Sequence, residues 1–229
     1  MTHKSPNNKT MARLKTGLFI LALAPLANLV AGACLDGLGA NPIEKITRST
    51  GYWTLAFLMI TLAVTPLRKL SGWNWPVRMR RMVGLFAFFY GSLHFLTYLA
   101  LDQFFDFPAI LADIVKRPYI TVGFSSFVLM MPLAVTSTDR MIRRLGGKRW
   151  KWLHRLVYPI AAGGVVHYWW LVKKDVSEPL TFAVILGVLL GIRLISPAVN
   201  FIRPVMDRLA AGLICGIDYL RDRLTPFHD

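Results

Sequence analysis

Six long apolar runs, separated by short polar segments, follow one another along most of the chain. They cover about residues 16–34, 52–67, 82–101, 119–136, 153–172 and 180–198. Each run is close in length to the roughly 20 residues that a helix needs to cross the hydrocarbon core of a bilayer. Because hydrocarbon offers no partner for backbone N–H and C=O groups, each run is predicted to be helical. The pattern therefore predicts an all-α membrane protein with a bundle of six transmembrane helices.

The polar segment after the last run has a different pattern. Hydrophobic residues return there every three or four positions, with arginines between them: Val205, Leu209, Leu213, Ile217, Leu220 and Leu224. This spacing predicts a short amphipathic helix on the cytoplasmic face, and a disordered tail is the alternative. The predicted organisation is a cytoplasmic N-terminus (1–15), a six-helix transmembrane domain (16–198) and an amphipathic cytoplasmic tail (199–229).

Basic residues are concentrated in alternate polar segments. The chain has 27 Lys and Arg against 12 Asp and Glu, and most of the basic ones lie in the N-terminal segment, near residues 68–81, near residues 140–151 and in the tail. By the positive-inside rule, both termini of this multi-pass membrane protein are predicted to be cytoplasmic. Cys34 and Cys215 then fall on opposite sides of the membrane. Nucleic-acid binding is disfavoured, because the basic residues lie in short loops between apolar runs.

The first run allows a second interpretation. Residues 31–33, Ala-Gly-Ala, have the small-residue pattern of a signal-peptidase site. The apolar stretch before them is long and contains Pro25 and Asn28, which favours a retained helix. Cleavage stays an open alternative, and it would leave the other five predicted helices unchanged.

Three histidines lie inside the apolar runs, where ionisable side chains are costly and usually functional. At about 1.5 Å per residue, His94 lies about 20 Å from the cytoplasmic start of its run, and His167 reaches the same depth on a parallel run. The two imidazoles can therefore meet in the periplasmic half of the membrane. Neutral imidazole is a common iron ligand, and two of them give a low-spin, electron-transferring haem. His94 and His167 are therefore predicted to be the axial ligands of one haem.

Glycines precede both of these histidines on the same helix face. Gly91 lies three residues before His94, and Gly163 and Gly164 lie four and three residues before His167. Without side chains, they are predicted to leave clearance for a porphyrin. Close packing between membrane helices is the alternative explanation.

Three arginines near the predicted membrane surfaces are candidates for binding anionic groups. Arg117 lies at the depth of a periplasmic-side haem propionate, and Arg80 and Arg81 lie where they could bind a cytoplasmic-side haem, a flavin phosphate or a quinone head. The alternative is that these arginines set the topology and contact lipid headgroups.

His154 lies near the cytoplasmic end of the fifth run, about 140° round the helix from His167. Pro159 lies between them and permits a kink that could realign the two side chains. The positions on the third run that match the depth of His154 are Arg80 and Arg81, which are not iron ligands. His154 is therefore a candidate ligand of a second haem, or it serves proton handling or contact with a flavin or quinone.

Several longer stretches carry a resemblance to a known family. They are "TPLR" at 65–68, "RRMVGLFAFFYGSLHFLTY" at 80–98, "RPYITVGFSSFVLMMPLAVTST" at 117–138 and "RRLGGKRWKWLHRLVY" at 143–158. Over about residues 14–200, the chain resembles the ferric-reductase-like transmembrane family. Within it, the chain is most similar to the haem-binding membrane subunits of bacterial periplasmic methionine sulfoxide reductase systems.

The resemblance implies cofactors and partners. It implies one b-type haem, or two, with His94, His154 and His167 as the iron ligands, and FMN. It further implies that electrons come from the quinone pool or a cytoplasmic flavin reductase. They would pass to a periplasmic molybdopterin enzyme (an MsrP-like protein) that repairs oxidised methionines. Catalytic reduction would then belong to the partner, and this chain would be an electron-transfer subunit.

Other classes of function stay open at this point. A proton-relaying transporter would also need histidines in its spans, but it would purify without colour. A structural membrane anchor would tolerate the loss of all three histidines. A transmembrane metal (ferric) reductase would act on external iron. About 30 residues follow the last run, and no GxGxxG motif follows a strand, so a fused nicotinamide domain is not expected.

Overall fold

A computed structural model describes residues 6–172 and 174–195, and every regular element in that part of the chain is helical. The helices are α1 Asn8–Cys34, α2 Pro42–Ser71, α3 Arg80–Thr97, α4 Phe107–Lys116, α5 Pro118–Val135, α6 Asp139–Leu145, α7 Gly147–Leu153 and α8 Val157–Leu171. Single turns of other helix types occupy Trp75–Arg78, Tyr98–Asp102 and His154–Leu156, and a last helix covers Ser177–Ile195. The chain divides into two compact units at Gly187, and the features below belong to the first, Met1–Gly187. The amphipathic helix predicted after Pro204 lies outside the described residues.

Five of the described helices are long and apolar enough to cross a membrane. They are Asn8–Cys34, Pro42–Ser71, Arg80–Asp102, Pro118–Val135 and Ser177–Ile195. The predicted run 153–172 differs, because it is divided into the turn His154–Leu156 and the 15-residue helix α8. Pro159 is the third residue of α8, and proline is favourable in the first helical turn but breaks a helix interior. All-α membrane architecture is therefore supported by five helices, and the sixth span stays a prediction.

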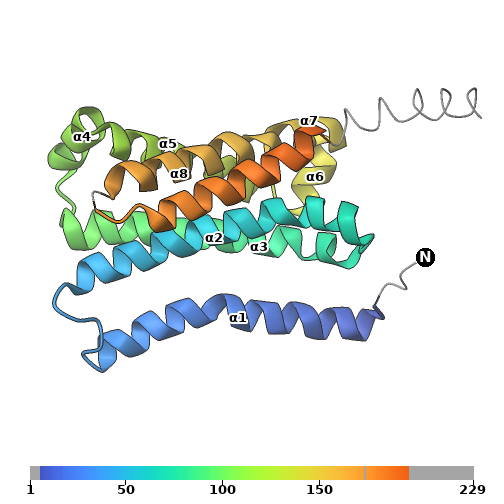
Figure 1. The fold of residues 1–229 in the computed structure, drawn as a ribbon, viewed down its shortest axis with the longest axis horizontal. Helices are drawn as coiled ribbons and strands as arrows, with labels where there is room; N and C mark the ends of the chain where they lie inside the picture. The colour runs from blue at the N-terminus through green and yellow to red at the C-terminus, as the bar shows by residue number, and fades with distance from the viewer. Residues whose placement is uncertain (1–5, 173, 196–229) are drawn as a thin grey trace, which may run out of the picture. The chain divides into compact units, whose positions relative to one another are not determined.

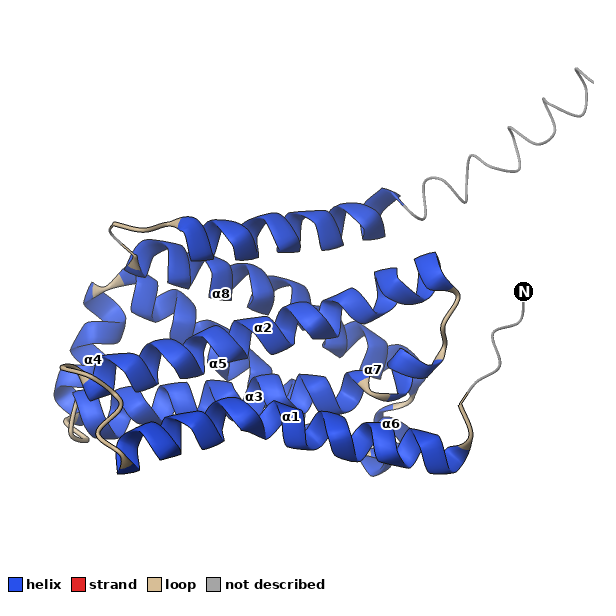
Figure 2. Ribbon diagram, turned by 60° about the horizontal axis from the view of Figure 1, so that its bottom comes forward, coloured by secondary structure: helices blue, strands red, loops and turns tan. Residues whose placement is uncertain are grey.

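Four of the helices pack together around the region of the predicted site. α2 packs most extensively against α3, and α5 packs against α8, while contacts of α3 with α5 and of α2 with α8 join the two pairs. Figure 1 shows these four helices running alongside one another, with α4 at one end and α6 and α7 at the other, and Figure 2 shows the same arrangement. Leu62 of α2 and Ala87 and Tyr90 of α3 are completely buried.

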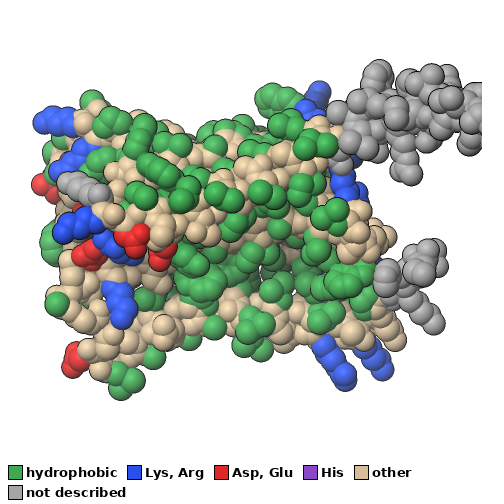
Figure 3. All heavy atoms as spheres, in the orientation of Figure 1, with side chains coloured by type: hydrophobic (Ala, Val, Ile, Leu, Met, Phe, Trp, Pro, Cys, Tyr) green, Lys and Arg blue, Asp and Glu red, His purple; other side chains and the backbone are tan. Residues whose placement is uncertain are grey.

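The outer surfaces of the helices are apolar. Many large hydrophobic side chains are exposed, among them Ile20, Leu21 and Val184. On the face drawn in Figure 3, hydrophobic side chains cover the middle of the helices, and Lys, Arg, Asp and Glu side chains gather toward the helix ends. This distribution fits helices whose middle faces hydrocarbon and whose ends reach water.

Helix α2 begins ten residues before the apolar run that predicted it. The Asn41 side chain accepts a hydrogen bond from the backbone N–H of Glu44, and Pro42 occupies the first helical position. Both features are typical of a helix N-terminus. Gly72, with φ of 72°, ends the helix in the left-handed conformation. The polar residues 42–51 are therefore the first turns of a long helix, although their composition suggests a loop.

Helix α1 is joined to α3 by one buried side chain. The Tyr90 hydroxyl donates to the carbonyl oxygen of Ala22 (2.8 Å) and accepts from the backbone N–H of Leu26 (3.2 Å). In an uninterrupted helix, that N–H and that carbonyl would bond to each other. Pro25, which has no N–H and disturbs a helix interior, lies beside them. The Tyr90 hydroxyl thus satisfies the α1 backbone at its proline. Whether α1 is retained or cleaved stays open.

Tyr90→Phe is expected to lower the free energy of unfolding by about 1–3 kcal/mol, because it leaves two buried backbone groups of α1 without their partner. The ring itself, which stacks on Phe57 at a centroid distance of 5.5 Å, is retained. The measurement is unfolding in mixed detergent micelles, followed by circular dichroism. Tyr52→Phe is the matched control, because Tyr52 is 40% exposed and its hydroxyl has no hydrogen bond among the described residues. Equal effects of the two substitutions would contradict the bridging role.

Candidate functional site

The imidazole of His94, on α3, is held by the backbone of α2. Its Nδ1 lies 2.9 Å from the carbonyl oxygen of Thr47. A carbonyl can only accept, so Nδ1 carries the hydrogen and donates it. The neutral ring then has its free lone pair on Nε2. Nε2 is therefore the nitrogen of His94 through which it could bind a metal ion, and its role as an iron ligand stays a prediction.

The imidazole of His167, on α8, is held in the same way by α5. Its Nδ1 lies 2.7 Å from the carbonyl oxygen of Tyr119 and donates to it. Among the described residues, neither His94 nor His167 makes a hydrogen bond through Nε2. A donating Nδ1–H with a free Nε2 is the arrangement that metal-bound histidines commonly have, because the outer hydrogen bond fixes the ring and raises ligand basicity.

The two rings face each other inside the helix bundle. Their centroids are 6.1 Å apart, and their planes are inclined at 79°. Two imidazoles that bind one metal ion from opposite faces at about 2 Å each would have centroids about 6 Å apart. Residues 6–172 and 174–195 contain no group of three or more His, Cys, Asp or Glu side chains that could hold a metal ion. The pair therefore fits a haem iron, which needs only two protein ligands, better than zinc.

Two glycines that sequence reasoning missed bring the helix backbones onto these rings. A Cβ placed on Gly51 would lie 3.1 Å from Cε1 of His94, and a Cβ placed on Gly123 would lie 2.6 Å from Nδ1 of His167. Each glycine follows the acceptor residue, Thr47 or Tyr119, by four positions. This relation could not be recognised in the sequence, because Thr47 and Tyr119 are identified as acceptors only by the packing of the helices.

The three glycines predicted to clear space for a porphyrin lie at contacts between helices. A Cβ on Gly91 would lie 3.4 Å from Thr54 Cγ2, and a Cβ on Gly164 would lie 3.1 Å from Leu55 Cδ1. Gly163 lies directly against the hydroxyl of Ser126 on α5. This placement agrees with the alternative of close packing. Clearance for a porphyrin stays a prediction for these positions.

His154 is not brought together with the other two histidines. It precedes α8, whereas His167 lies near the end of α8, about 20 Å further along the helix axis. Its Nε2 lies 3.2 Å from the hydroxyl of Thr136, which itself donates to the carbonyl oxygen of Pro132 (2.6 Å). The hydroxyl must therefore accept, so Nε2 of His154 carries the hydrogen. This tautomer is opposite to that of His94 and His167.

An aromatic ring also covers His154. The indole of Trp150 stacks on its imidazole at a centroid distance of 4.0 Å, and Trp150 Nε1 donates to the carbonyl oxygen of Thr136 (2.9 Å). Two residues thus restrain His154 at the end of the bundle that carries α6 and α7. Its role as an iron ligand stays a prediction.

Each predicted anion-binding arginine has a protein partner. Arg80 Nη1 donates to Thr65 Oγ1 (3.5 Å), and Arg81 Nη1 forms a 2.6 Å ion pair with Asp139. The latter joins the start of α3 to the start of α6. Binding of propionate, flavin or quinone by these two residues stays a prediction.

Arg117 lies at the other end of the bundle, before α5. Its Nη1 donates to the hydroxyl of Tyr119 (3.4 Å), and its Nε lies 3.2 Å from a carboxylate oxygen of Asp113. The bond to Tyr119 and the charge of Asp113 raise the pKa of Arg117, so it keeps its charge. Tyr119 also supplies the carbonyl that holds His167. Arg117 is therefore two residues before the residue that holds His167. Binding of a haem propionate by Arg117 stays a prediction.

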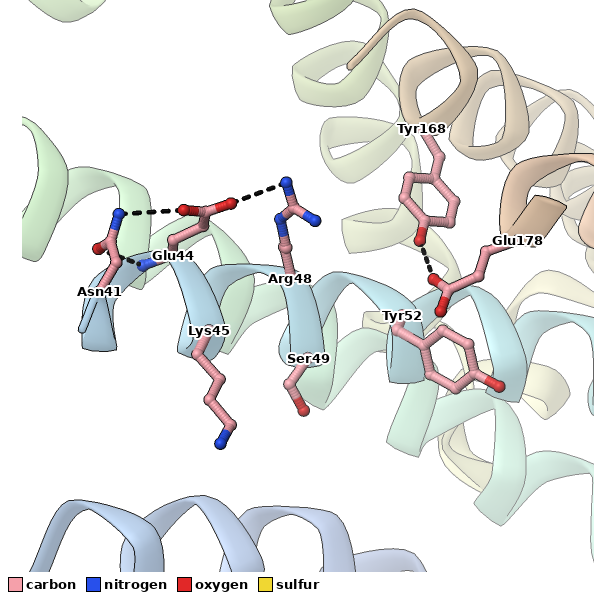
Figure 4. A pocket seen from close by; sticks show the side chains of 8 residues that line it. All are labelled: Asn41, Glu44, Lys45, Arg48, Ser49, Tyr52, Tyr168 and Glu178. Atoms are coloured by element: carbon pink, nitrogen blue, oxygen red, sulfur yellow. Dashed lines mark hydrogen bonds and ion pairs between the residues drawn. The ribbon is translucent and has the colours of Figure 1, made fainter. Parts of the chain in front are cut away.

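A polar pocket adjoins the elements that hold the histidine pair. Its volume is about 510 Å³, and it is lined by Asn41, Glu44, Lys45, Arg48, Ser49, Tyr52, Tyr168 and Glu178. Figure 4 shows the Tyr168 hydroxyl donating to Glu178. It also shows Glu44 between Asn41, which donates to it, and Arg48, whose guanidinium forms a 2.7 Å ion pair with it. Arg48 and Tyr168 directly follow Thr47 and His167. Most of the lining comes from the first turns of α2, which sequence reasoning had assigned to a loop.

Comparisons with known proteins show the family to which the chain belongs. The sequence model of the family described as "Ferric reductase like transmembrane component" matches residues 50–165. The chain is 60% identical to the "Protein-methionine-sulfoxide reductase heme-binding subunit MsrQ" of Herminiimonas arsenicoxydans over 193 residues, which cover 83% of this chain and 88% of the relative. The protein of the same name from Azospira oryzae is 56% identical over 191 residues, covering 83% and 82%. That of Rhodospirillum rubrum is 60% identical over 186 residues, covering 81% and 89%.

These matches define the class of the protein. The chain belongs to the ferric-reductase-like transmembrane family and, within it, to the group of MsrQ subunits. Together with the five apolar helices, this membership makes it a multi-pass membrane protein.

Proposed function

We propose that this chain is the membrane haem-binding, electron-transfer subunit of a methionine sulfoxide reductase system. The observation that carries the proposal is the facing pair of imidazoles, 6.1 Å apart, each donating through Nδ1 and each with a free Nε2. The names of the relatives, which are heme-binding subunits, support the same reading. His94 and His167 would hold the haem iron from its two faces.

The bound haem supplies one-electron chemistry, by cycling between ferric and ferrous iron. We propose haem b, as the resemblance implies. The chain has two cysteines and no CxxC motif, which argues against covalent attachment of the c type. The protein's part is to orient the ligands. The carbonyls of Thr47 and Tyr119 fix the tautomers, and the packed helices α2, α3, α5 and α8 keep water away.

The direction of electron flow follows from the resemblance and from the charge pattern. Electrons enter from the quinone pool or from a cytoplasmic flavin reductase, with FMN as a further cofactor. They leave on the periplasmic side of the inner membrane to a molybdopterin reductase subunit, which reduces oxidised methionines. The histidine pair lies toward the end of the bundle that carries α4, which the positive-inside rule assigns to the periplasm.

The first test is the visible spectrum of the protein, purified in mild detergent after expression with ample haem. A Soret band and a b-type α-band after dithionite reduction are expected, and a pyridine-haemochrome assay gives the haem count. The reduced haem should be reoxidised when the periplasmic partner and methionine sulfoxide are added together, and not by methionine sulfoxide alone. A colourless protein would overturn the proposal in favour of a transporter or an anchor.

His154→Ala is expected to keep the haem held by His94 and His167. The reason is that Nε2 of His154 is engaged with Thr136, at the opposite end of the bundle from the pair. The haem count of this variant is compared with that of the unaltered protein. A wild-type count of two with a variant count of one would assign His154 to a second haem. Complete loss of haem would contradict the separation of His154 from the pair.

A further inference from the structure

We propose that Gly51 and Gly123 are positioning residues for the two haem ligands. Each keeps a helix backbone bare where an imidazole lies on it, so that the carbonyls of Thr47 and Tyr119 fix the two ring planes nearly perpendicular to each other. This inference rests on the proposed haem site. It adds to that site the two residues that set the orientation of the ligand rings. The orientation of the rings in turn affects the electronic state of the iron.

The spacing of four residues has a geometric cause. In an α-helix, the carbonyl of residue i points along the axis toward the N–H of residue i+4. A side chain from another helix that donates to this carbonyl must therefore lie alongside residue i+4. Thr47 and Gly51 have this relation on α2, and the ring of His94 lies beside Gly51. A side chain at position 51 would occupy the place of the ring.

The same relation recurs on α5, with less room. Tyr119 supplies the carbonyl, and a Cβ on Gly123 would lie 2.6 Å from Nδ1, 2.8 Å from Cε1 and 3.0 Å from Cγ of His167. At Gly51, the corresponding distances to Nδ1 and Cε1 of His94 are both 3.1 Å. Real Cβ atoms essentially never approach as closely as at Gly123, so the ring of His167 must move if position 123 gains a methyl group. At Gly51, a shift of a few tenths of an ångström suffices.

The orientation that results has a spectroscopic consequence. The two ring planes are inclined at 79°. The plane of an axial imidazole decides which iron d orbital its π electrons overlap with. Two perpendicular planes act on two different d orbitals equally, which leaves these orbitals nearly degenerate. A ferric low-spin haem of this kind gives a single, strongly anisotropic EPR signal at high g value, whereas parallel planes give a three-line rhombic spectrum.

The test compares Gly51→Ala and Gly123→Ala with two other glycine substitutions. Gly32→Ala is the matched control for Gly51→Ala, because its Cβ would also approach a neighbour closely, at 2.9 Å, but that neighbour is a methyl group of Leu38. Gly17→Ala adds a methyl group where nothing lies within 4 Å. Glycine-to-alanine changes raise helix propensity at all four positions, so any loss does not come from the helices themselves.

Haem per chain, the EPR spectrum of the oxidised protein and the midpoint potential are measured on each purified variant. The unaltered protein is expected to give the high-g signal. Gly51→Ala is expected to keep its haem and shift this signal to lower g. Gly123→Ala is expected to shift it further or to lose haem. Gly32→Ala and Gly17→Ala are expected to match the unaltered protein.

Two results would overturn the inference. One is a rhombic spectrum of the unaltered protein, which would mean that the ring planes are not perpendicular. The other is a spectrum and potential of Gly51→Ala that match those of Gly32→Ala. If Gly123→Ala fails to fold, Gly51→Ala still decides between the outcomes. Absence of haem from the unaltered protein is a different result, because it rejects the proposed function itself.

Discussion

Replacing His94 or His167 with alanine is expected to remove the haem from the purified protein, with loss of the Soret and α-bands. Each substitution removes one of the two imidazoles, whose ring centroids are 6.1 Å apart. Residues 6–172 and 174–195 contain no cluster of three or more His, Cys, Asp or Glu side chains that would offer another metal site. Loss of a ligand's hydrogen-bond partner alone costs about 10–100-fold in metal affinity, and loss of the ligand itself costs more.

The matched control for this experiment is Ser92→Ala. Ser92 lies two residues before His94 on α3, and its hydroxyl donates only to the carbonyl oxygen of Phe88 on the same helix (2.9 Å). It is expected to retain its full haem content. Circular dichroism and size-exclusion profiles show whether each variant is folded. If folded His94→Ala and His167→Ala proteins both keep full haem with an unchanged spectrum, the ligand assignment is wrong.

In intact cells, a membrane-impermeant maleimide is expected to label Cys34 and not Cys215. Cys34 ends α1 and is exposed, and the positive-inside rule assigns it to the periplasm. Cys215 belongs to the tail that the same rule assigns to the cytoplasm. Cys215→Ser protein should therefore be labelled in intact cells, and Cys34→Ser protein only after the inner membrane is permeabilised. A double Cys→Ser variant gives the background.

The labelling experiment has a clear contrary outcome. Labelling of Cys215 and not Cys34 in intact cells would invert the orientation, and it would place the histidine pair on the cytoplasmic side. Labelling of both from outside would mean an even number of membrane crossings between them. Because the pair lies toward one end of the bundle, the orientation decides on which side the haem can exchange electrons with a soluble partner.

Sequence reasoning separated His154 from the other two histidines by its depth, but it did not show which ring nitrogen of each is free. His94 and His167 have Nδ1 on a backbone carbonyl and Nε2 free, whereas His154 has Nε2 on a hydroxyl and a tryptophan over its ring. Which ring nitrogen is free depends on residues 18 to 48 positions away, and therefore on the packing of the helices.

The helix boundaries illustrate a second limit of the pattern. Hydrophobicity predicts only the part of a helix that faces hydrocarbon, so it predicted 52–67 where α2 extends over Pro42–Ser71. It also predicted one continuous helix over 153–172, where a turn and the short helix α8 occur. Pro159 was seen as a possible kink, but its placement in the first turn of α8 depends on how the segment before it packs.

The sequence by itself determined that the chain is a helical membrane protein, because the length of an apolar run and the need to satisfy its backbone in hydrocarbon leave little choice of structure. It also indicated that His94 and His167 share one depth, since helical rise converts chain position directly into height. The tertiary structure decided what the rings contact. Gly51 and Gly123 became recognisable as neighbours of the rings only once α2 lay against α3 and α5 against α8. Height along an axis is a property of one helix, but close approach depends on the rotation of two helices about their axes.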